Sequence, residues 1–572
     1  MDGPLVIQRP MRWDNPFSED MTEEDVERIL KIPPFSEMNE KDFPPSASLR
    51  DIIRNDTRIQ RYKSGDIVVR KGDYGNSAFM IMTGALRVVI SPDLPSEMLG
   101  RQTATRRGFY DSLKQLWQNA VMPEVRAYTG GTANIPMGQR GAGDSAHVFL
   151  QDVPGIIEKH NTVKLEEGTF FGEIAALGRT PRGASLFAED DCELIEIRWQ
   201  GLRDIRRRDD AFRNHIDKLY RERSLGGHLR ALPMFKNLSE EDLKKVADAT
   251  VFETHGEYEW HTSFKKFAEL SPQERLRREP VIASEGDYVD GLILIRSSFC
   301  RVSRKINHGN PTAAYLGKGE TFGFGELVHN WKNDDQVPYQ FTLRGLGNVD
   351  ILRVPTPIME EIVLPTLSES EFPPPLTILD DSIQTIKDIT SNQDIDPGLL
   401  EFLVENRTIN GSATMLIDTN RCVRCDDCTR ACAATHNNNP RFVRHGRTYS
   451  NIMVANACMH CTDPVCMIGC PTGAIHRSSL EGQVVVNDAT CIGCATCANS
   501  CPYNNIRMVE VRDANGRFIR DENNAPIVKS TKCDLCVDQM GGPSCERACP
   551  HNALRRADMS NLKPIAEWLN NS

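Results

Sequence analysis

The sequence has 572 residues, of which 40% are hydrophobic and 26% charged, with a formal net charge of −11. The length suggests about four domains, and the composition excludes a disordered or fibrous protein. No apolar run reaches the roughly 18 residues of a membrane helix, and the start lacks the basic and apolar segments of an export signal. We therefore expect a cytoplasmic protein without direct membrane insertion.

Charge and cysteine are unevenly distributed along the chain. Residues 1–410 hold 51 Lys/Arg against 64 Asp/Glu, an acidic balance that argues against a nucleic-acid partner. Cys192 and Cys300 are the only cysteines before residue 422, and sixteen follow in the last 151 residues. We expect the two early thiols to be buried apolar side chains. Tight clusters without an export signal suggest metal rather than disulfides.

Residues 1–42 are polar and Pro-rich, with one amphipathic stretch, "TEEDVERILKI", and we expect a tail that docks elsewhere. Residues 43–225 contain short apolar runs such as "DIVVR", "AFMIM" and "CELIEIRW", separated by Gly and Asp turns. This pattern predicts an antiparallel β-roll, or jelly roll, with flanking helices. An insertion at 91–162 contains a predicted helix, "RGFYDSLKQLWQNAVM", and a charge-rich helix is expected at 201–224.

The stretch "GTFFGEIAALGRTPRGASLFA" (168–188) resembles the phosphate-binding cassette of cyclic-nucleotide-binding domains, as in catabolite activator protein. The resemblance implies that Glu173 accepts from a ribose hydroxyl and that Arg182 meets the cyclic phosphate. Gly172 and Gly183 would add backbone N–H donors. The implied ligand is cyclic AMP or cyclic GMP. The alternative is an empty barrel retained for docking or stability.

Residues 226–365 are interpreted as a second domain of the same fold. Its cassette, "GKGETFGFGELVHNWKNDDQVPYQFTLRG" (317–345), keeps Gly325 and Glu326 but has Tyr339 where the arginine belongs. A buried phosphate would lack its charge partner there, so we predict a degenerate pocket that binds no nucleotide. No basic recognition helix follows either barrel, which argues against DNA binding.

A Pro/Ser-rich linker at 366–411, with a predicted helix near "DPGLLEFLVEN", leads to the final unit, 412–572. This unit repeats one cysteine motif four times. The four groups are Cys422, Cys425, Cys428 and Cys432; Cys458, Cys461, Cys466 and Cys470; Cys491, Cys494, Cys497 and Cys501; and Cys533, Cys536, Cys545 and Cys549.

The spacing of these cysteines favours [4Fe–4S] clusters. A C-x2-C-x2-C loop supplies three thiolates to one cubane, and the cysteine three residues later ligates another cluster. Zinc is the alternative, but four-cysteine zinc sites use two separated pairs and no tight triple. Three groups end in Cys-Pro, whereas the first has Ala433 in that position. Since no group lacks a cysteine, we predict four cubanes and no three-iron cluster.

Residues 412–572 resemble the four-cluster iron–sulfur subunits of the dimethyl-sulfoxide-reductase, nitrate-reductase and formate-dehydrogenase families, through "CPTGAI", "CPYNNI" and "KCDLC…GGPSCERACP". The resemblance implies an α+β polyferredoxin domain of two ferredoxin-like halves, with the clusters in a linear wire. It also implies four ligand sets: Cys422, Cys425, Cys428 with Cys549 (set 1); Cys533, Cys536, Cys545 with Cys432 (set 2); Cys458, Cys461, Cys466 with Cys501 (set 3); and Cys491, Cys494, Cys497 with Cys470 (set 4).

Several cations flank the predicted ligands and either offset the cluster charge or are ordinary solvated residues. They are Arg421, Arg424, Arg430, Lys532 and Arg547. His436 and His460 also lie near the cysteines, but each cubane is complete without them. We therefore expect both to be ordinary loop histidines.

Taken together, these patterns predict a non-catalytic electron-transfer subunit of a multi-subunit oxidoreductase. It would relay electrons between partners, one of them a flavin- or molybdopterin-containing subunit, in an oligomer. The barrels would serve regulation or docking. No nucleophile triad, P-loop or dinucleotide fingerprint stands out, and no catalytic residue is predicted. The alternative is a redox or oxygen sensor that signals through the nucleotide-binding domains.

Overall fold

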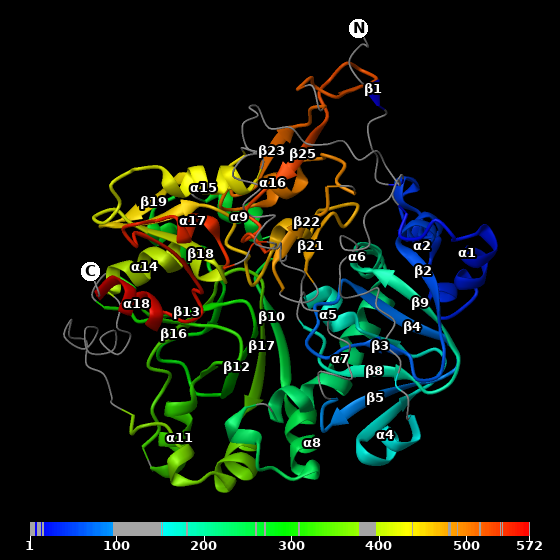
Figure 1. Cartoon of the computed structure of the whole chain (residues 1–572). Coiled ribbons are helices and arrows are strands. Elements are labelled where there is room, and N and C mark those ends of the chain that lie inside the picture. Colours follow the sequence, from blue (N-terminus) through cyan, green and yellow to red (C-terminus); the bar gives the residue numbers. More distant parts are fainter. Residues whose placement is uncertain are drawn as a thin grey trace.

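The structure is a computed structural model of the chain, with two β-roll domains and a cysteine-rich domain that lies across both of them (Figure 1). It describes residues 6–7, 13, 16–94, 150, 153–178, 181–230, 232–257, 260–267, 270–306, 309–333, 335–376, 396–436, 439–478, 482–488, 490–513, 516–537, 539 and 541–570. The helix predicted within 91–162 lies outside these residues.

The first β-roll consists of two four-stranded antiparallel sheets, ordered β2-β9-β4-β7 and β3-β8-β5-β6. Apolar residues of both sheets form its interior, and Cys192 is buried in β9 as predicted. Its strands are β2 (Thr57–Tyr62), β3 (Ile67–Val69), β4 (Ser77–Thr83), β5 (Leu86–Ser91), β6 (Asn161–Leu165), β7 (Phe170–Phe171), β8 (Ser185–Ala188) and β9 (Cys192–Arg198). Its helices are α2 (Leu49–Asp56), α4 (Val153–Lys159), α5 (Glu173–Gly178), α6 (Trp199–Arg208) and α7 (Asp210–Arg230). The helix expected at 201–224 is therefore confirmed.

The second β-roll has sheets ordered β10-β17-β12-β15 and β11-β16-β13-β14. Its strands are β10 (Val251–His255), β11 (Val281–Ala283), β12 (Gly291–Ser297), β13 (Cys300–Ser303), β14 (Thr312–Leu316), β15 (Thr321–Phe322), β16 (Thr342–Gly345) and β17 (Val349–Pro355). Its helices are α8 (Glu240–Ala249), α9 (Trp260–Lys266), α10 (Pro272–Arg278), α11 (Phe324–Lys332) and α12 (Thr356–Ile358). Cys300 is fully buried in β13, again as predicted.

The two β-rolls share one topology. In each, the first, eighth, third and sixth strands form one sheet, and the second, seventh, fourth and fifth strands form the other. The prediction of two antiparallel β-rolls is confirmed. The helices α9 and α10 separate the first two strands of the second roll, a place where the first roll has a short turn.

The cysteine-rich domain is built on a sheet ordered β19-β20-β18-β26, in which β18 (Thr414–Asp418) pairs with β26 (Leu554–Ala557). This pairing brings the start and end of the domain together. The other elements are β19 (Val443–Tyr449), β20 (Ile452–Asn456), β21 (Ile475–Arg477), β22 (Val484–Val486), β23 (Arg507–Glu510), β24 (Arg520–Asp521), β25 (Val528–Thr531), α15 (Asp427–Thr435), α16 (Thr496–Ser500), α17 (Ser544–Arg547) and α18 (Lys563–Asn570).

The described parts of the N-terminal segment and of the linker pack against the domains. β1 (Val6–Ile7) pairs in parallel with β24 of the cysteine-rich domain. The predicted amphipathic stretch forms α1 (Glu23–Leu30), capped by Thr22 and buried through Val26 and Ile29. The helix expected in the linker forms as α14 (Pro397–Glu405), and its leucines share a core with the second roll and with β18 and β20.

One hydrophobic core joins the first roll to the cysteine-rich domain. It includes Ile195 and Trp199 from the roll together with Met467, Cys470 and Cys497. Burial of apolar surface at such a contact is worth about 25 cal/mol per Å2. The predicted cluster loops and the first roll therefore share one hydrophobic core.

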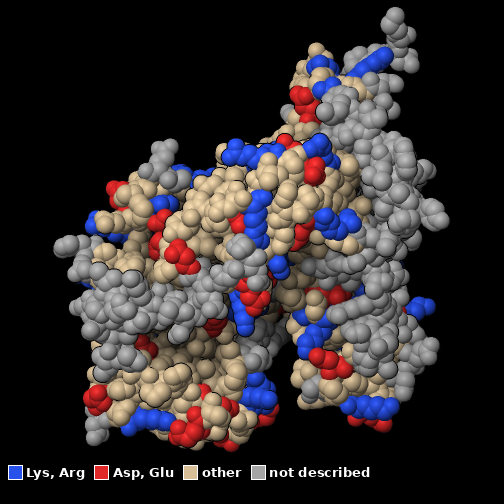
Figure 2. All heavy atoms as spheres, turned by 60° about the vertical axis from the view of Figure 1, so that its left-hand side comes forward, with Lys and Arg blue, Asp and Glu red and all other residues tan. Residues whose placement is uncertain are grey.

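The face seen in Figure 2 has interspersed acidic and basic side chains between broad uncharged areas, and a notch separates its two lower lobes. Among the described residues, no helix has both the length and the apolar character needed to cross a membrane.

Candidate functional site

The cysteine loops contain non-glycine residues in the left-handed backbone region. The φ angles are 60° at Arg424, 65° at Asp426, 49° at His460, 62° at Ala495 and 60° at Leu535. Each such residue costs roughly 1–2 kcal/mol and persists where its surroundings determine the conformation. Arg424, His460 and Leu535 each lie two residues after the first cysteine of their loop, and Gly493 (φ 69°) has this place in the third loop, so the four loops share a left-handed position.

The structure brings the sixteen cysteines together in four groups. Cys422, Cys425, Cys428 and Cys549 line one small cavity. Burial raises the pKa of the Cys432 thiol, and the neighbouring charges of Cys533, Cys545 and Cys536 raise it further. The pKa of Cys461 is raised by burial and then by Cys458, Cys466 and Cys501. Burial raises the pKa of Cys497 to about 12, with further contributions from Cys470, Cys491 and Cys494.

Electrostatic effects and one shared arginine relate neighbouring groups in a fixed order. Cys428 of set 1 is among the charges that raise the pKa of Cys545 in set 2. Arg556 donates to the Cys533 sulfur of set 2 at 3.0 Å and to the Cys458 carbonyl of set 3 at 3.2 Å. Cys497 of set 4 likewise acts on the pKa of Cys466 in set 3. The order is therefore set 1, set 2, set 3, set 4.

The donor atoms fit iron–sulfur clusters. None of the eighteen cysteines forms a disulfide. Backbone N–H groups point at ligand sulfurs: Arg441 N–H at Cys432 (3.2 Å), Asn505 N–H at Cys501 (3.4 Å), Leu535 N–H at Cys533 (3.4 Å) and Ala553 N–H at Cys549 (3.3 Å). Such hydrogen bonds set the reduction potential of a thiolate-bound cluster. Burial favours the neutral thiols, so binding of iron here would release protons.

The first nucleotide cassette has its predicted residues in one place. Gly172 has a φ of 80° and precedes α5, whose first residue, Glu173, is buried. The Arg182 guanidinium donates to the carbonyls of Gly172 and Ser77, both at 2.7 Å. Gly183 has open space where a side chain would lie. The arginine is thus oriented toward the start of α5, where the resemblance implies a phosphate.

Tyr339 occupies the corresponding place in the second roll. A Cβ at Gly323, which has a φ of 85°, would lie 2.6 Å from the Tyr339 ring, and a Cβ at Gly172 would lie 2.6 Å from the Arg182 guanidinium. The Tyr339 hydroxyl donates to the Gly291 carbonyl at 2.9 Å. The side chain is 2% exposed and fills its site with a neutral ring.

Two family models match the chain. The model of the 4Fe-4S dicluster domain matches residues 449–559, which contain three of the four cysteine groups. The model of the cyclic nucleotide-binding domain matches residues 156–209, which contain Glu173 and Arg182.

Known proteins match the C-terminal part as well. The electron transport protein HydN of Escherichia coli is 33% identical over 168 residues, which are 27% of this chain and 91% of HydN. The chain belongs to the family of 4Fe-4S electron-transport proteins. One chain of the anaerobic dimethyl sulfoxide reductase of Haemophilus influenzae is 32% identical over 26% of this protein and 74% of its own length. One subunit of the tetrathionate reductase of Salmonella typhimurium is 30% identical, over 26% of this protein and 58% of its own length.

This 4Fe-4S protein thus carries cyclic-nucleotide-binding domains in front of its iron–sulfur part.

Of the cations predicted to flank the ligands, Lys532 is buried and donates to the carbonyls of Cys533 (2.7 Å) and Val484. Arg421 stacks on Trp568 and pairs with Asp418 at 3.2 Å. The remaining three, Arg424, Arg430 and Arg547, are exposed. Exposed cations and cations with fixed contacts are therefore both present in the predicted set.

The sequence did not predict the contacts of two polar groups that lie beside set 2. Arg556 lies seven residues after Cys549 and belongs to no motif. Burial opposes its charge, but the negative charges of Cys533, Cys545, Cys458 and Cys432 raise the pKa of its guanidinium. Its position on β26 beside β18 is the only signal that could have suggested it.

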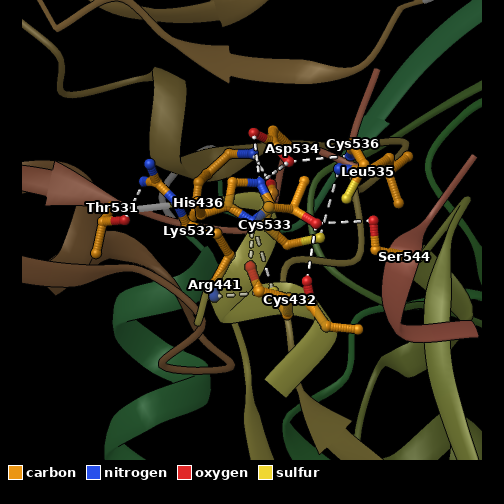
Figure 3. A network of polar contacts seen from close by, with 12 residues as sticks. Cys432, His436, Arg441, Thr531, Lys532, Cys533, Asp534, Leu535, Cys536 and Ser544 are labelled. Carbon is orange, nitrogen blue, oxygen red and sulfur yellow. Dashed lines mark hydrogen bonds and ion pairs between the residues drawn. The ribbon is translucent and has the colours of Figure 1, made fainter. Parts of the chain in front are cut away.

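The second missed group is His436, which we expected to be an ordinary loop histidine. Its side chain pairs with Asp534 at 3.0 Å and contacts the Cys432 carbonyl at 2.7 Å, as Figure 3 shows. Burial raises the pKa of the Asp534 carboxyl, but the hydrogen bond and charge of His436 outweigh this effect and hold the pKa well below its usual range. The pair fastens the loops of the first and fourth cysteine groups to each other.

Proposed function

We propose that residues 412–572 hold four [4Fe–4S] clusters and relay electrons between redox partners. The observation that supports this best is the order of the cysteine groups, in which each set lies near enough to the next to act on its charges or to share Arg556 with it. Set 1 is Cys422, Cys425, Cys428 and Cys549; set 2 is Cys432, Cys533, Cys536 and Cys545; set 3 is Cys458, Cys461, Cys466 and Cys501; and set 4 is Cys470, Cys491, Cys494 and Cys497. A cubane in each set would make a continuous row.

The domain limits and partners belong to the same proposal. The chain divides into a tail (1–42), two nucleotide-binding-like domains (43–225 and 226–365), a linker (366–411) and the cluster domain (412–572). Two of the relatives are named as one component of a larger reductase. By analogy, this chain exchanges electrons with a separate catalytic subunit that carries a flavin or molybdopterin. The clusters supply one-electron transfer, and the protein's own residues position them and tune their potentials.

Metal analysis of anaerobically prepared protein tests the cluster count. We expect about sixteen iron and sixteen sulfide per chain, four of each per cubane. The reduced protein should then pass electrons to the catalytic subunit with which it co-purifies. About eight iron would leave two sets empty and break the row, and zinc in place of iron would end the proposal.

We further propose that the first roll binds a cyclic nucleotide through Gly172, Glu173, Arg182 and Gly183, and that its occupancy acts on set 3. Tyr74 forms a β-bridge with Pro181, the residue before Arg182. The Tyr74 ring packs on Gly482, and Arg477 lies 5.2 Å over that ring. Arg477 in turn donates to the Cys461 carbonyl at 2.7 Å.

These contacts link the cassette to a ligand loop through two side chains. A phosphate that binds Arg182 would act next to Pro181, the residue that forms the bridge with Tyr74. Coupling requires that the nucleotide favour one arrangement of these contacts over another. The coupling is reciprocal, so reduction of the clusters should change nucleotide affinity by the same factor.

Arg182→Ala is expected to weaken cyclic AMP and cyclic GMP binding by at least about tenfold, because a hydrogen bond to a charged group is lost. Calorimetry on the unmodified and variant proteins measures the change. Arg61→Ala is the matched control, since that arginine is 81% exposed on β2 and pairs with Glu193 instead. No heat of binding in the unmodified protein would remove the nucleotide from the proposal and leave the roll as a docking module.

A further inference from the structure

A large cavity lies between the second roll and the segment of the linker helix α14, and two of its lining residues contact the cysteine-rich domain. Its volume is about 580 Å3, within the range of small-molecule sites. Three aromatic residues of the α9 segment line it, Trp260, Phe264 and Phe267, together with arginines and glutamates from α10, β13 and α14. It is separate from the degenerate cassette, which Tyr339 fills. Neither the proposed electron relay nor the proposed nucleotide site of the first roll uses this cavity.

The walls of this cavity are fixed to two cysteine loops. Trp260 Nε1 donates to Asp463 at 2.9 Å, between Cys461 and Cys466. The Tyr503 hydroxyl, two residues after Cys501, donates to the Arg407 carbonyl at 2.7 Å. Helix α9 accordingly lies next to α16 in Figure 1. The cavity is a built feature of the domain contact rather than a gap between loosely placed parts.

Most of the charges that line the cavity neutralise one another. Arg301 is 4% exposed and pairs with Glu279 at 3.0 Å and Glu401 at 2.7 Å. Arg275 pairs with Glu405 at 3.4 Å. These pairs are part of the wall and are not available to a ligand.

Two guanidinium groups have no such partner among the described residues. Arg407 lies 5.3 Å from the Trp260 ring and 5.4 Å from the Phe264 ring, and its buried Nη1 has no hydrogen-bond acceptor there. Burial lowers the pKa of this guanidinium. Arg278 is exposed and lies 4.1 Å over Phe267, and it forms no ion pair with the described residues. Both arginines line the cavity, so an anion bound there would meet two guanidinium groups that form no ion pair with a described carboxylate.

We propose that this cavity binds a mononucleotide, with the phosphate held by Arg407 and Arg278 and the ring packed among the aromatic side chains. Planar rings stack on aromatic side chains and on guanidinium planes. Glu257 lines the same cavity and accepts from Ser263, so it offers an acceptor to a ribose hydroxyl or ring amino group. Inorganic phosphate would leave the aromatic wall unused, and an uncharged aromatic compound would leave the arginines without an acceptor.

Calorimetry on the anaerobically prepared full chain carrying Arg182→Ala tests the proposal, because this substitution weakens binding at the first cassette. Adenosine 5′-monophosphate and flavin mononucleotide are the probes, with adenosine and inorganic phosphate as partial ligands. We expect at least one mononucleotide to bind at least about tenfold more tightly than either partial ligand, a factor typical of one charge-assisted hydrogen bond. Equal binding of phosphate and mononucleotide, or no binding of either mononucleotide, would overturn the proposal.

Two variants and one control assign the binding to the cavity. Arg278→Gln and Arg407→Asn should each weaken mononucleotide binding by about tenfold or more. Asparagine suits position 407 because φ is 53° there and asparagine tolerates the left-handed region. Arg277→Gln, an exposed neighbour on α10 outside the cavity, should change affinity by less than about twofold.

Hydrogen exchange of the unmodified chain gives a second readout that needs no variant. Mononucleotide should slow the exchange of amides in α9 and α10, which form the aromatic and cationic walls. Unchanged exchange in both helices at saturating nucleotide would place the binding elsewhere and contradict the proposal. Neither test depends on the number of clusters, so this inference and the electron-relay proposal stand or fall separately.

Discussion

Cys497→Ala is expected to destabilise the first β-roll as well as the cluster domain. Cys497 is buried in the core that also contains Ile195 and Trp199 of that roll. Losing a metal ligand is among the most destabilising classes of substitution, and we expect about 3 kcal/mol or more. For a domain of about 150–250 residues, this loss of stability lowers the melting temperature by roughly 6–12 °C. Hydrogen exchange of β4 and β9 reports the effect on the roll directly.

Cys425→Ala is the matched control for this prediction. Cys425 is a proposed ligand of set 1, lines the small cavity of that set and lies outside the shared core. Its loss should damage set 1 but leave exchange in β4 and β9 close to that of the unmodified protein. Equal effects of the two variants on the roll would mean that the cluster domain unfolds as one unit. The specific coupling between set 4 and the roll would then be wrong.

The dependence of the roll on set 4 also bears on the purpose of the first domain. Met467, Cys470 and Cys497 belong to the same hydrophobic core as Ile195 and Trp199 of the roll. The roll and the cysteine loops therefore share packing whether or not a nucleotide binds. This link is what a regulatory or docking role requires.

Much of the fold could be predicted from the sequence because the decisive patterns are local. Short apolar runs between Gly and Asp turns identify both rolls, and "TEEDVERILKI" contains the Thr22 cap and the apolar positions of α1. The first and third cysteine loops have the same spacing, and both are left-handed four residues after their first cysteine, at Asp426 and Ala495. In these cases the residues that determine the geometry are neighbours in the chain.

The contacts between domains could not be predicted in this way. Arg477 and Tyr74 are some four hundred residues apart, and nothing in either local pattern points to the other. Helices α9 and α10 interrupt the second roll, and the sequence patterns did not predict this segment, although its Trp260 and Arg278 line the cavity of about 580 Å3. Such contacts depend on how complete domains pack together, which neither periodicity nor motif spacing encodes.

Arg556→Gln is expected to lower the reduction potential of the cluster proposed for set 2. The guanidinium donates to the Cys533 sulfur at 3.0 Å, so it stabilises the extra negative charge of the reduced cluster. A hydrogen bond to a charged group contributes about 1.5–3 kcal/mol. For one electron that corresponds to roughly 60–130 mV. Redox titration followed by electron paramagnetic resonance measures the shift.

Arg555→Gln is the control, because adjacent residues of a strand point to opposite faces of the sheet. Arg555 lies opposite Leu416 in the register of β26 and β18, whereas Arg556 lies opposite Met415. At moderate ionic strength its charge is screened, and we expect a shift of less than about 20 mV. Equal shifts in the two variants would show that only the overall charge matters. If only Arg556→Gln shifts the reduction potential, this side chain tunes the cluster proposed for set 2. Because Arg556 lies between sets 2 and 3, it would then affect the driving force of electron transfer between them.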